Sequence, residues 1–175
     1  MADRPNILYI HSHDSGRFIE PYGHAIPTPN MMRLAKEGTL FRQAFCAAPT
    51  CSASRSALVT GQSPHSNGMN GLTHRGFDLH NYKHHILHTL KSVGYTSALY
   101  GVQHITPDAD KIGYDEILAG TTPAEFLNNA PTEPFFLSVG FSDTHRPYLE
   151  PGPDEDERYT LPPPPLPDTP ATRRE

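Results

Sequence analysis

Residues 135–141 read FFLSVGF, an apolar run that is typical of a buried strand. Just upstream, residues 122–125 read TPAE, a capping box that predicts the start of a short helix. Earlier in the chain, apolar residues at helical spacing over 86–93 stop at Gly94 and lead into a second predicted strand at 95–100. Because predicted strands alternate with predicted helices, the sequence favours an α/β fold with a mostly parallel sheet.

The amino-terminal part of the chain follows the same plan. Residues 6–11 read NILYIH and predict a short buried strand. Thr28, Pro29 and Gly38 are expected to be the N-cap, the first residue and the terminator of a helix. Residues 39–45 are a weaker strand candidate. The fold expected from these patterns is therefore a sheet flanked by helices.

Ionisable side chains follow three of the predicted strands at the point where each strand ends. They are His13 and Asp14 after the first strand, His104 after the strand at 95–100, and Asp143 and His145 after the last. In open α/β sheets the ligand site lies outside the carboxyl ends of the strands. We therefore expect these side chains to be delivered to one edge of the sheet.

Residues 51–61 read CSASRSALVTG and predict a helix that ends at Gly61. Cys51 would lie at the amino terminus of this helix, and Arg55 would lie one turn further along on the same face. Both the helix dipole and the guanidinium group favour an anion at that position. On these residues alone, a small buried cysteine beside a surface arginine is an equally good interpretation.

The same stretch resembles the signature C-x-P-x-R-x-x-x-L-x-T-G of the type I, formylglycine-dependent sulfatases. Its continuation GQSPHSNGMNGL is similar to the sulfamidase, or heparan N-sulfatase-like, branch of that family. Further resemblances occur in the family's order along the chain, in PNILYIHSHDSG at 5–16, GVQH at 101–104 and PFFLSVGFSDTHRP at 134–147. The resemblance implies the amino-terminal part of an alkaline-phosphatase-like fold that is incomplete at its carboxyl end. Residues 1–150 would belong to the catalytic domain, and the proline-rich residues 151–175 would be extended.

The resemblance also implies a function, namely hydrolysis of a sulfate ester or sulfamate by a formylglycine derived from Cys51. Cys51, Arg55, His104 and His145 are the implied catalytic residues: Arg55 steadies charge, His145 protonates the leaving group and His104 takes a proton from the nucleophile. Asp14, His13 and the converted Cys51 are the implied ligands of Ca²⁺. The partners implied are a small-molecule or saccharide sulfate and the formylglycine-generating enzyme.

Three further residues are candidates for substrate binding. His65 and His74 are expected in loops after the nucleophile helix, where contact with a substrate is plausible. Asp143 could contact substrate or position His145, and capping of a turn is an equal alternative.

Several positions depart from the family pattern. The family usually has an aspartate where this chain has His13, which weakens a calcium site or suits manganese or zinc. Ala53 replaces the signature proline, and Val102 replaces a lysine near the sulfate. A second pair of metal ligands and another lysine of the family lie downstream of Glu175.

Other histidines are expected to be structural. His84 and His88, four residues apart on the helix expected over 84–93, could suit zinc, but no third ligand is apparent nearby. His11 is expected to face away from His13.

Composition limits the alternatives. The net charge is −5 and no basic stripe exists, so nucleic-acid binding is not expected. No apolar run approaches the roughly 20 residues of a membrane span, and the absence of a signal peptide predicts a cytoplasmic location for the sequence as given. The remaining alternatives are a phosphonate or phosphate ester hydrolase of the same superfamily, an inactive truncated fragment, and a thiol enzyme that uses unmodified Cys51.

Overall fold

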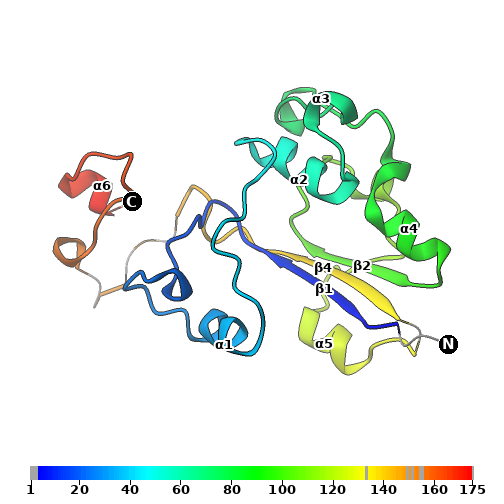
Figure 1. Cartoon of the computed structure of the whole chain (residues 1–175), viewed down its shortest axis with the longest axis horizontal. Helices are drawn as coiled ribbons and strands as arrows, with labels where there is room; N and C mark the ends of the chain where they lie inside the picture. The colour runs from blue at the N-terminus through cyan, green and yellow to red at the C-terminus, as the bar shows by residue number, and fades with distance from the viewer. Residues whose placement is uncertain (1–3, 133, 149, 151, 154–155, 175) are drawn as a thin grey trace.

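The computed structural model describes residues 4–132, 134–148, 150, 152–153 and 156–174. Its centre is a parallel sheet with the strand order β1-β4-β2-β3 (Figure 1). The strands are β1 (Ile7–His11), β2 (Thr96–Gly101), β3 (Glu116–Ile117) and β4 (Phe135–Gly140). The expected parallel sheet is therefore confirmed.

Helices lie on both faces of this sheet. In Figure 1, α2, α3 and α4 cover one face and α5 lies against the other. The described α-helices are α1 (Pro29–Glu37), α2 (Cys51–Thr60), α3 (Pro64–Asn67), α4 (Ile86–Ser92), α5 (Pro123–Asn128) and α6 (Pro170–Arg174). None of the described helices is long and apolar enough to cross a membrane.

The central strand β4 packs against the helices on both faces of the sheet. It pairs with β1 on one side and β2 on the other, and every residue of it is buried. Because side chains alternate across a strand, Phe136 packs into a cluster on the face of α3 and α4, whereas Phe135 and Leu137 pack into a cluster with Phe126 of α5. An apolar run without a polar face is what such a doubly covered strand requires.

Local signals explain the positions of the helices. Thr122 and Glu125 form the expected capping box at the start of α5: Thr122 N–H donates to Glu125 Oε2 at 2.7 Å, and Glu125 N–H donates to Thr122 Oγ1. α2 ends at Gly61, which adopts a left-handed φ of 66°. The predicted bounds of α1 and α2 agree with the structure.

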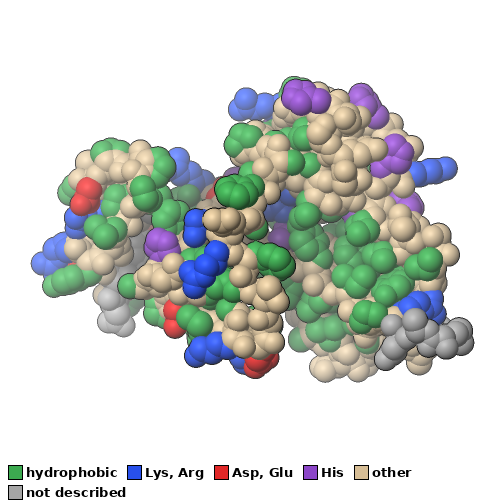
Figure 2. All heavy atoms as spheres, in the orientation of Figure 1, with side chains coloured by type: hydrophobic (Ala, Val, Ile, Leu, Met, Phe, Trp, Pro, Cys, Tyr) green, Lys and Arg blue, Asp and Glu red, His purple; other side chains and the backbone are tan. Residues whose placement is uncertain are grey.

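The strand β1 forms one edge of the sheet. It pairs only with β4 among the described strands, and Leu8 and Ile10 are 45% and 53% exposed. Figure 2 shows apolar side chains gathered over the face of the molecule where β1 runs.

Three expectations about the elements of the fold were wrong. Residues 39–45 form no strand, because they have no ladder partner, and Phe41 and Phe45 are 69% and 89% exposed. The helix expected over 84–93 is split, because the 3₁₀ turn Tyr82–His84 ends before α4 and His85 caps α4 instead. His84 and His88 therefore do not share one helix face.

The third correction concerns the proline-rich tail. Within its described part the tail is not extended throughout, since it contains the 3₁₀ turn Glu157–Tyr159 and α6. Ion pairs with Asp168 and Glu157 hold Arg173 and Arg174 of α6. Figure 1 shows this segment lying apart from the sheet.

Candidate active site

The carboxyl ends of three strands meet at one edge of the sheet. In the register of the sheet, His11 of β1 and Gly101 of β2 both lie beside Gly140 of β4. The loops that follow these residues bring three of the predicted site histidines together. The ring centroids of His13 and His145 are 4.9 Å apart, and those of His13 and His104 are 5.3 Å apart.

Two glycines allow the strands to approach so closely at this edge. A Cβ atom on Gly140 would lie 1.9 Å from the carbonyl oxygen of Val102 and 2.6 Å from Cε1 of His11. A Cβ atom on Gly101 would lie 2.2 Å from the carbonyl oxygen of Gly140. Only a residue without a side chain fits where backbones pass at this distance.

The backbone is also unusual at two of the predicted site residues. Asp14 and His104 have φ angles of 47° and 57°, and among the described residues they are the non-glycine positions with positive φ. Aspartate and histidine tolerate this region better than most side chains, but it is sparsely populated and concentrates at functional sites. Each of them lies three residues after the end of its strand.

Cys51 reaches the same edge from a different element. It is the first residue of α2, follows the N-cap Thr50, and is half-buried. One ligand atom each from Cys51, His13 and His104 lie within 4.8 Å of one another. A second group with the same spacing comprises His13, Asp14 and His145. The two groups share His13, which is 3% exposed.

Arg55 lies one turn after Cys51 and is fixed by two contacts. Its guanidinium group donates to Nδ1 of His11 and, at 3.3 Å, to the carbonyl oxygen of Ser12. The expectation that His11 points away from the site was therefore wrong. Side chains two residues apart on a strand share a face, so His11 and His13 could have been assigned to one side from the sequence.

A cleft of about 380 Å³ opens beside these residues. Cys51, Arg55, Asp14 and the second cysteine, Cys46, are among the residues that line it. It is open enough to admit an anionic group to the end of α2.

Three imidazoles of this region, those of His11, His13 and His104, have lowered pKa values and are therefore largely neutral at neutral pH. Burial, and then the charge of Arg55, lowers the pKa of His13 to about 4, and the same causes lower the pKa of His11 to about 4. The pKa of His104 is also lowered, first by burial and then by Arg55. The Nδ1 atoms of His13 and His104 are buried and have no hydrogen-bond partner in the described part of the chain.

His145 is oriented by its own loop. Its Nδ1 lies 2.6 Å from the carbonyl oxygen of Arg146, which can only accept, so Nδ1 carries the proton and Nε2 faces the site. Nε2 lies 3.9 Å from Oδ2 of Asp14. A hydrogen bond joins this loop to the loop that follows β1, because the hydroxyl of Thr144 donates to the carbonyl oxygen of His13.

The three substrate-binding candidates differ in position. The His74 ring stacks on that of His104, with centroids 6.0 Å apart and planes 9° apart. His65 is exposed on α3, outside the donor groups and the cleft. Asp143 is exposed after β4, and no hydrogen bond joins it to His145 within the described residues.

The donor atoms at the edge are a poor match for calcium. Calcium takes six to eight oxygen ligands, whereas the two groups offer imidazole nitrogens, one thiol and the carboxylate of Asp14. Nitrogen-rich sets of this kind suit zinc better. The orphaned Nδ1 atoms of His13 and His104 are consistent with nitrogen ligands at this position.

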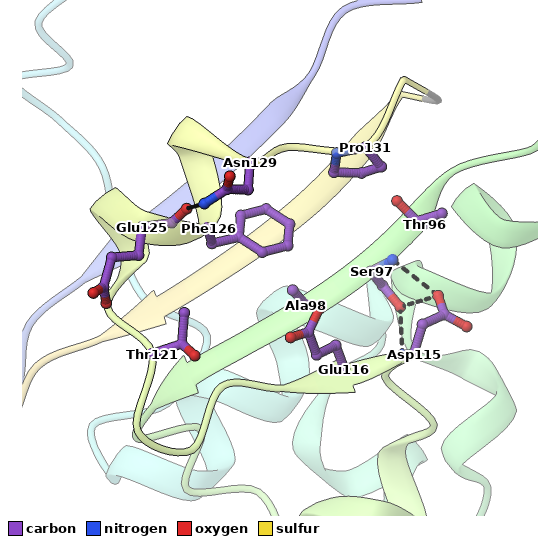
Figure 3. A pocket seen from close by; sticks show the side chains of 10 residues that line it. All are labelled: Thr96, Ser97, Ala98, Asp115, Glu116, Thr121, Glu125, Phe126, Asn129 and Pro131. Carbon is purple, nitrogen blue, oxygen red and sulfur yellow. Dashed lines mark hydrogen bonds between the residues drawn. The ribbon is translucent and has the colours of Figure 1, made fainter.

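A second cavity of about 410 Å³ lies on the other side of the sheet beneath α5 (Figure 3). Asp115, one of the carboxylates that line it, accepts from the backbone and hydroxyl of Ser97 and pairs with Lys91 at 2.6 Å. These contacts satisfy Asp115. No group of metal-ligand side chains lies there among the residues that the structure describes.

Comparison with known proteins identifies the family of the chain. The Sulfatase family model matches residues 5–125. The N-sulphoglucosamine sulphohydrolase of Homo sapiens is 30% identical over 162 residues, which are 81% of this chain and 32% of that protein. An ulvan-active sulfatase of Formosa agariphila is 29% identical over 161 residues, covering 83% of this chain and 26% of that protein.

Solved structures share the fold. The crystal structure of Ps i-CgsB in complex with k-i-k-neocarrahexaose has a TM-score of 0.71 and 26% identity, with 85% of this chain and 47% of that chain covered. A protein solved with its substrate D-glucosamine-2-N,6-O-disulfate has a TM-score of 0.71 and 22% identity, with coverage of 85% and 36%.

The expected resemblance and the alkaline-phosphatase-like fold are thereby confirmed, although the chain spans only 26% to 32% of the first curated relatives. With its signature cysteine and arginine on α2 and its strand ends gathered at one edge, the chain belongs to the sulfatase family, of which it represents an amino-terminal part.

Proposed function

We propose that this chain supplies the nucleophile and both proton-transfer groups of an active site that hydrolyses a sulfate ester or a sulfamate. The observation that carries the proposal is the meeting of Cys51, His104 and His145 with His13 and Asp14 at one edge of the sheet. Family membership supports sulfate chemistry there. Because the chain spans less than a third of its first curated relatives, the activity is proposed for a protein that holds a whole catalytic domain.

The nucleophile would come from Cys51. Its conversion to formylglycine, with the formylglycine-generating enzyme as partner, would supply a hydrated aldehyde whose hydroxyl attacks sulfur. The amino terminus of α2 and the guanidinium of Arg55 both favour negative charge at that residue. The contacts of Arg55 with His11 and Ser12 hold the guanidinium in place before substrate arrives.

Two histidines would move the protons. His145 has its Nδ1 occupied by a carbonyl oxygen, so Nε2 is the nitrogen that would donate to the departing oxygen or nitrogen of the substrate. His104 has a lowered pKa, so its imidazole is available to accept a proton from the nucleophile at neutral pH. Both rings lie against that of His13, with centroid distances of 5.3 Å for His104 and 4.9 Å for His145.

A divalent cation would be held by Asp14 and His13 beside residue 51. Such an ion supplies Lewis-acid polarisation of sulfate oxygens when bound. The nitrogen donor of His13 favours zinc over calcium at this place.

The substrate class proposed is a saccharide sulfate, with an N-sulfated amino sugar as first choice. The identity shared with the N-sulphoglucosamine sulphohydrolase supports that choice. His74, which stacks on His104, is the candidate best placed to contact the sugar, and His65 and Asp143 are proposed to lie further out.

Mass spectrometry of the peptide that contains residue 51 tests the nucleophile. After co-expression with a formylglycine-generating enzyme, we expect a lower peptide mass and loss of thiol reactivity at Cys51, whereas Cys46 stays a thiol. A peptide that keeps its thiol mass under conditions that convert a known sulfatase would contradict the proposal.

Paired substrates test the reaction. A protein that contains this chain within a whole domain is expected to hydrolyse N-sulfoglucosamine or an aryl sulfate faster than the matching phosphate. A faster phosphate reaction would instead identify a phosphate or phosphonate ester hydrolase of the same superfamily.

A further inference from the structure

The group formed by His13, Cys51 and His104 has a property that sulfate hydrolysis does not use. Its three ligand atoms lie within 4.8 Å of one another, and they comprise two imidazole nitrogens and one thiol sulfur, without an oxygen. This donor set exists only while residue 51 is a cysteine. It is therefore a feature of the unconverted chain.

The chemistry of these donors selects a class of ion. Zinc is bound by imidazole nitrogen and thiolate sulfur in tetrahedral sites, often with water in the fourth position, whereas calcium and magnesium take oxygen ligands. The His13 residue is 3% exposed. The Nδ1 atoms of His13 and His104 are buried and lack a hydrogen-bond partner in the described part of the chain. Unpartnered buried nitrogens of this kind are costly unless a ligand satisfies them.

The backbone holds the three donors from three separate elements. His13 follows β1, His104 follows β2 at a φ of 57°, and Cys51 begins α2. The loop of His13 is fixed by the hydroxyl of Thr144, which donates to the carbonyl oxygen of His13. Little rearrangement is needed to bring the three atoms onto one ion.

We propose that, before conversion of Cys51, this chain binds a zinc-class transition ion through the sulfur of Cys51 and imidazole nitrogens of His13 and His104. The thiol proton passes to solvent on binding, and water completes the coordination. Bound metal would cover the sulfur and protect it from reaction. The proposal goes beyond sulfate hydrolysis, since it concerns a form of the protein that lacks the proposed nucleophile.

Cobalt(II) is a spectroscopic probe for such a site. Titrated into the purified thiol form, it is expected to give the near-ultraviolet band of a thiolate–cobalt bond and visible bands of tetrahedral cobalt, both removed by an equivalent of zinc. Cys51→Ser should abolish the near-ultraviolet band, and His13→Asn or His104→Asn should weaken binding at least about tenfold. Cys46→Ser and His65→Asn are matched controls that should leave the spectrum unchanged, because neither residue belongs to the group.

Thiol reactivity of the unaltered protein gives a second readout that needs no variant to fold. Zinc is expected to slow the reaction of Cys51 with a disulfide reagent at least tenfold, with full recovery after chelation, while exposed Cys46 reacts at its original rate. The proposal is overturned if Cys51 and Cys46 respond equally to zinc, if no thiolate band forms, or if an equal concentration of calcium displaces the metal. Neither readout depends on sulfatase activity.

Discussion

At the scale of single residues, His85 makes stability depend on pH. Burial lowers the pKa of His85 to about 4, and its Nδ1 accepts a hydrogen bond from the backbone N–H of Leu87 at the start of α4. The unfolded chain binds the proton near pH 6.5, so between pH 6.5 and 4 it holds more protons than the folded chain. Stability is therefore full above pH 6.5 and is lost as the pH falls towards 4.

His85→Asn tests this contribution, because asparagine keeps an acceptor at the N-cap and removes the titration. Urea unfolding at pH 7.5 and 5.0 should show a pH-dependent loss that is about 2 kcal/mol smaller in the variant than in the original protein. The buried His13 and the half-buried His11 remain in both proteins, so some loss persists. Equal losses in the two proteins would show that His85 is not kept neutral by the fold.

The residues of the site were predictable where a motif or a strand end marked them. The start of α2 marks the positions of Cys51 and Arg55. The ends of the strands mark the positions of His13, His104 and His145. The side of the strand on which His11 lies follows from its two-residue spacing to His13, but its contact with Arg55, 44 residues away in sequence, is encoded by no local pattern. The stacking of His74 on His104 is likewise a tertiary contact.

At the scale of elements, the close approach of strands at Gly140 should govern stability. A Cβ atom there would collide with the backbone oxygen of Val102, which cannot move without breaking the sheet edge. We expect Gly140→Ala to lower the free energy of unfolding by more than about 3 kcal/mol, or to prevent folding. Urea unfolding followed by circular dichroism measures this change.

Gly61→Ala is the matched control for that substitution. Gly61 has a φ of 66° but open space around its Cα, so alanine there meets backbone strain without a collision. Its cost should be about 1 kcal/mol. If the two variants lose similar stability, the steric account of Gly140 is incorrect.

The elements themselves were predictable when several local signals agreed. The apolar run of β4, the capping box of α5 and the terminating Gly61 of α2 each placed an element close to its bounds. β3 could not be found, because a strand of two residues has no visible period and exists through its pairing with β2. The strand predicted over residues 39–45 was wrong for the opposite reason. Its side chains suit a strand, but no neighbouring strand is present among the described residues to pair with it.

At the scale of the whole molecule, the sheet has an open side. β1 is an edge strand with half-exposed Leu8 and Ile10, and an edge of this kind is normally covered or paired in a complete domain. The first curated relatives are three to four times longer than the stretch they share with this chain, judged from coverage of 32% and 26%. The sequence could predict that the site lies at the carboxyl ends of the strands. It could not predict which surfaces of the sheet remain uncovered.

This incompleteness leads to a prediction for residues 1–175 on their own. Calcium needs several oxygen ligands, and the carboxylate of Asp14 is the oxygen donor in the donor groups at the strand ends. Val102 stands where the family resemblance leads us to expect a lysine. Calorimetric titration with calcium should therefore give little heat.

Turnover of an aryl sulfate by the converted chain should be at least about 100-fold slower than by a full-length relative, because the cation contributes several kcal/mol of transition-state stabilisation. The same assay on a whole-domain sulfatase run in parallel shows that conditions are adequate. Comparable turnover by the two proteins would mean that the strand ends described above form a sufficient catalytic site without further ligands.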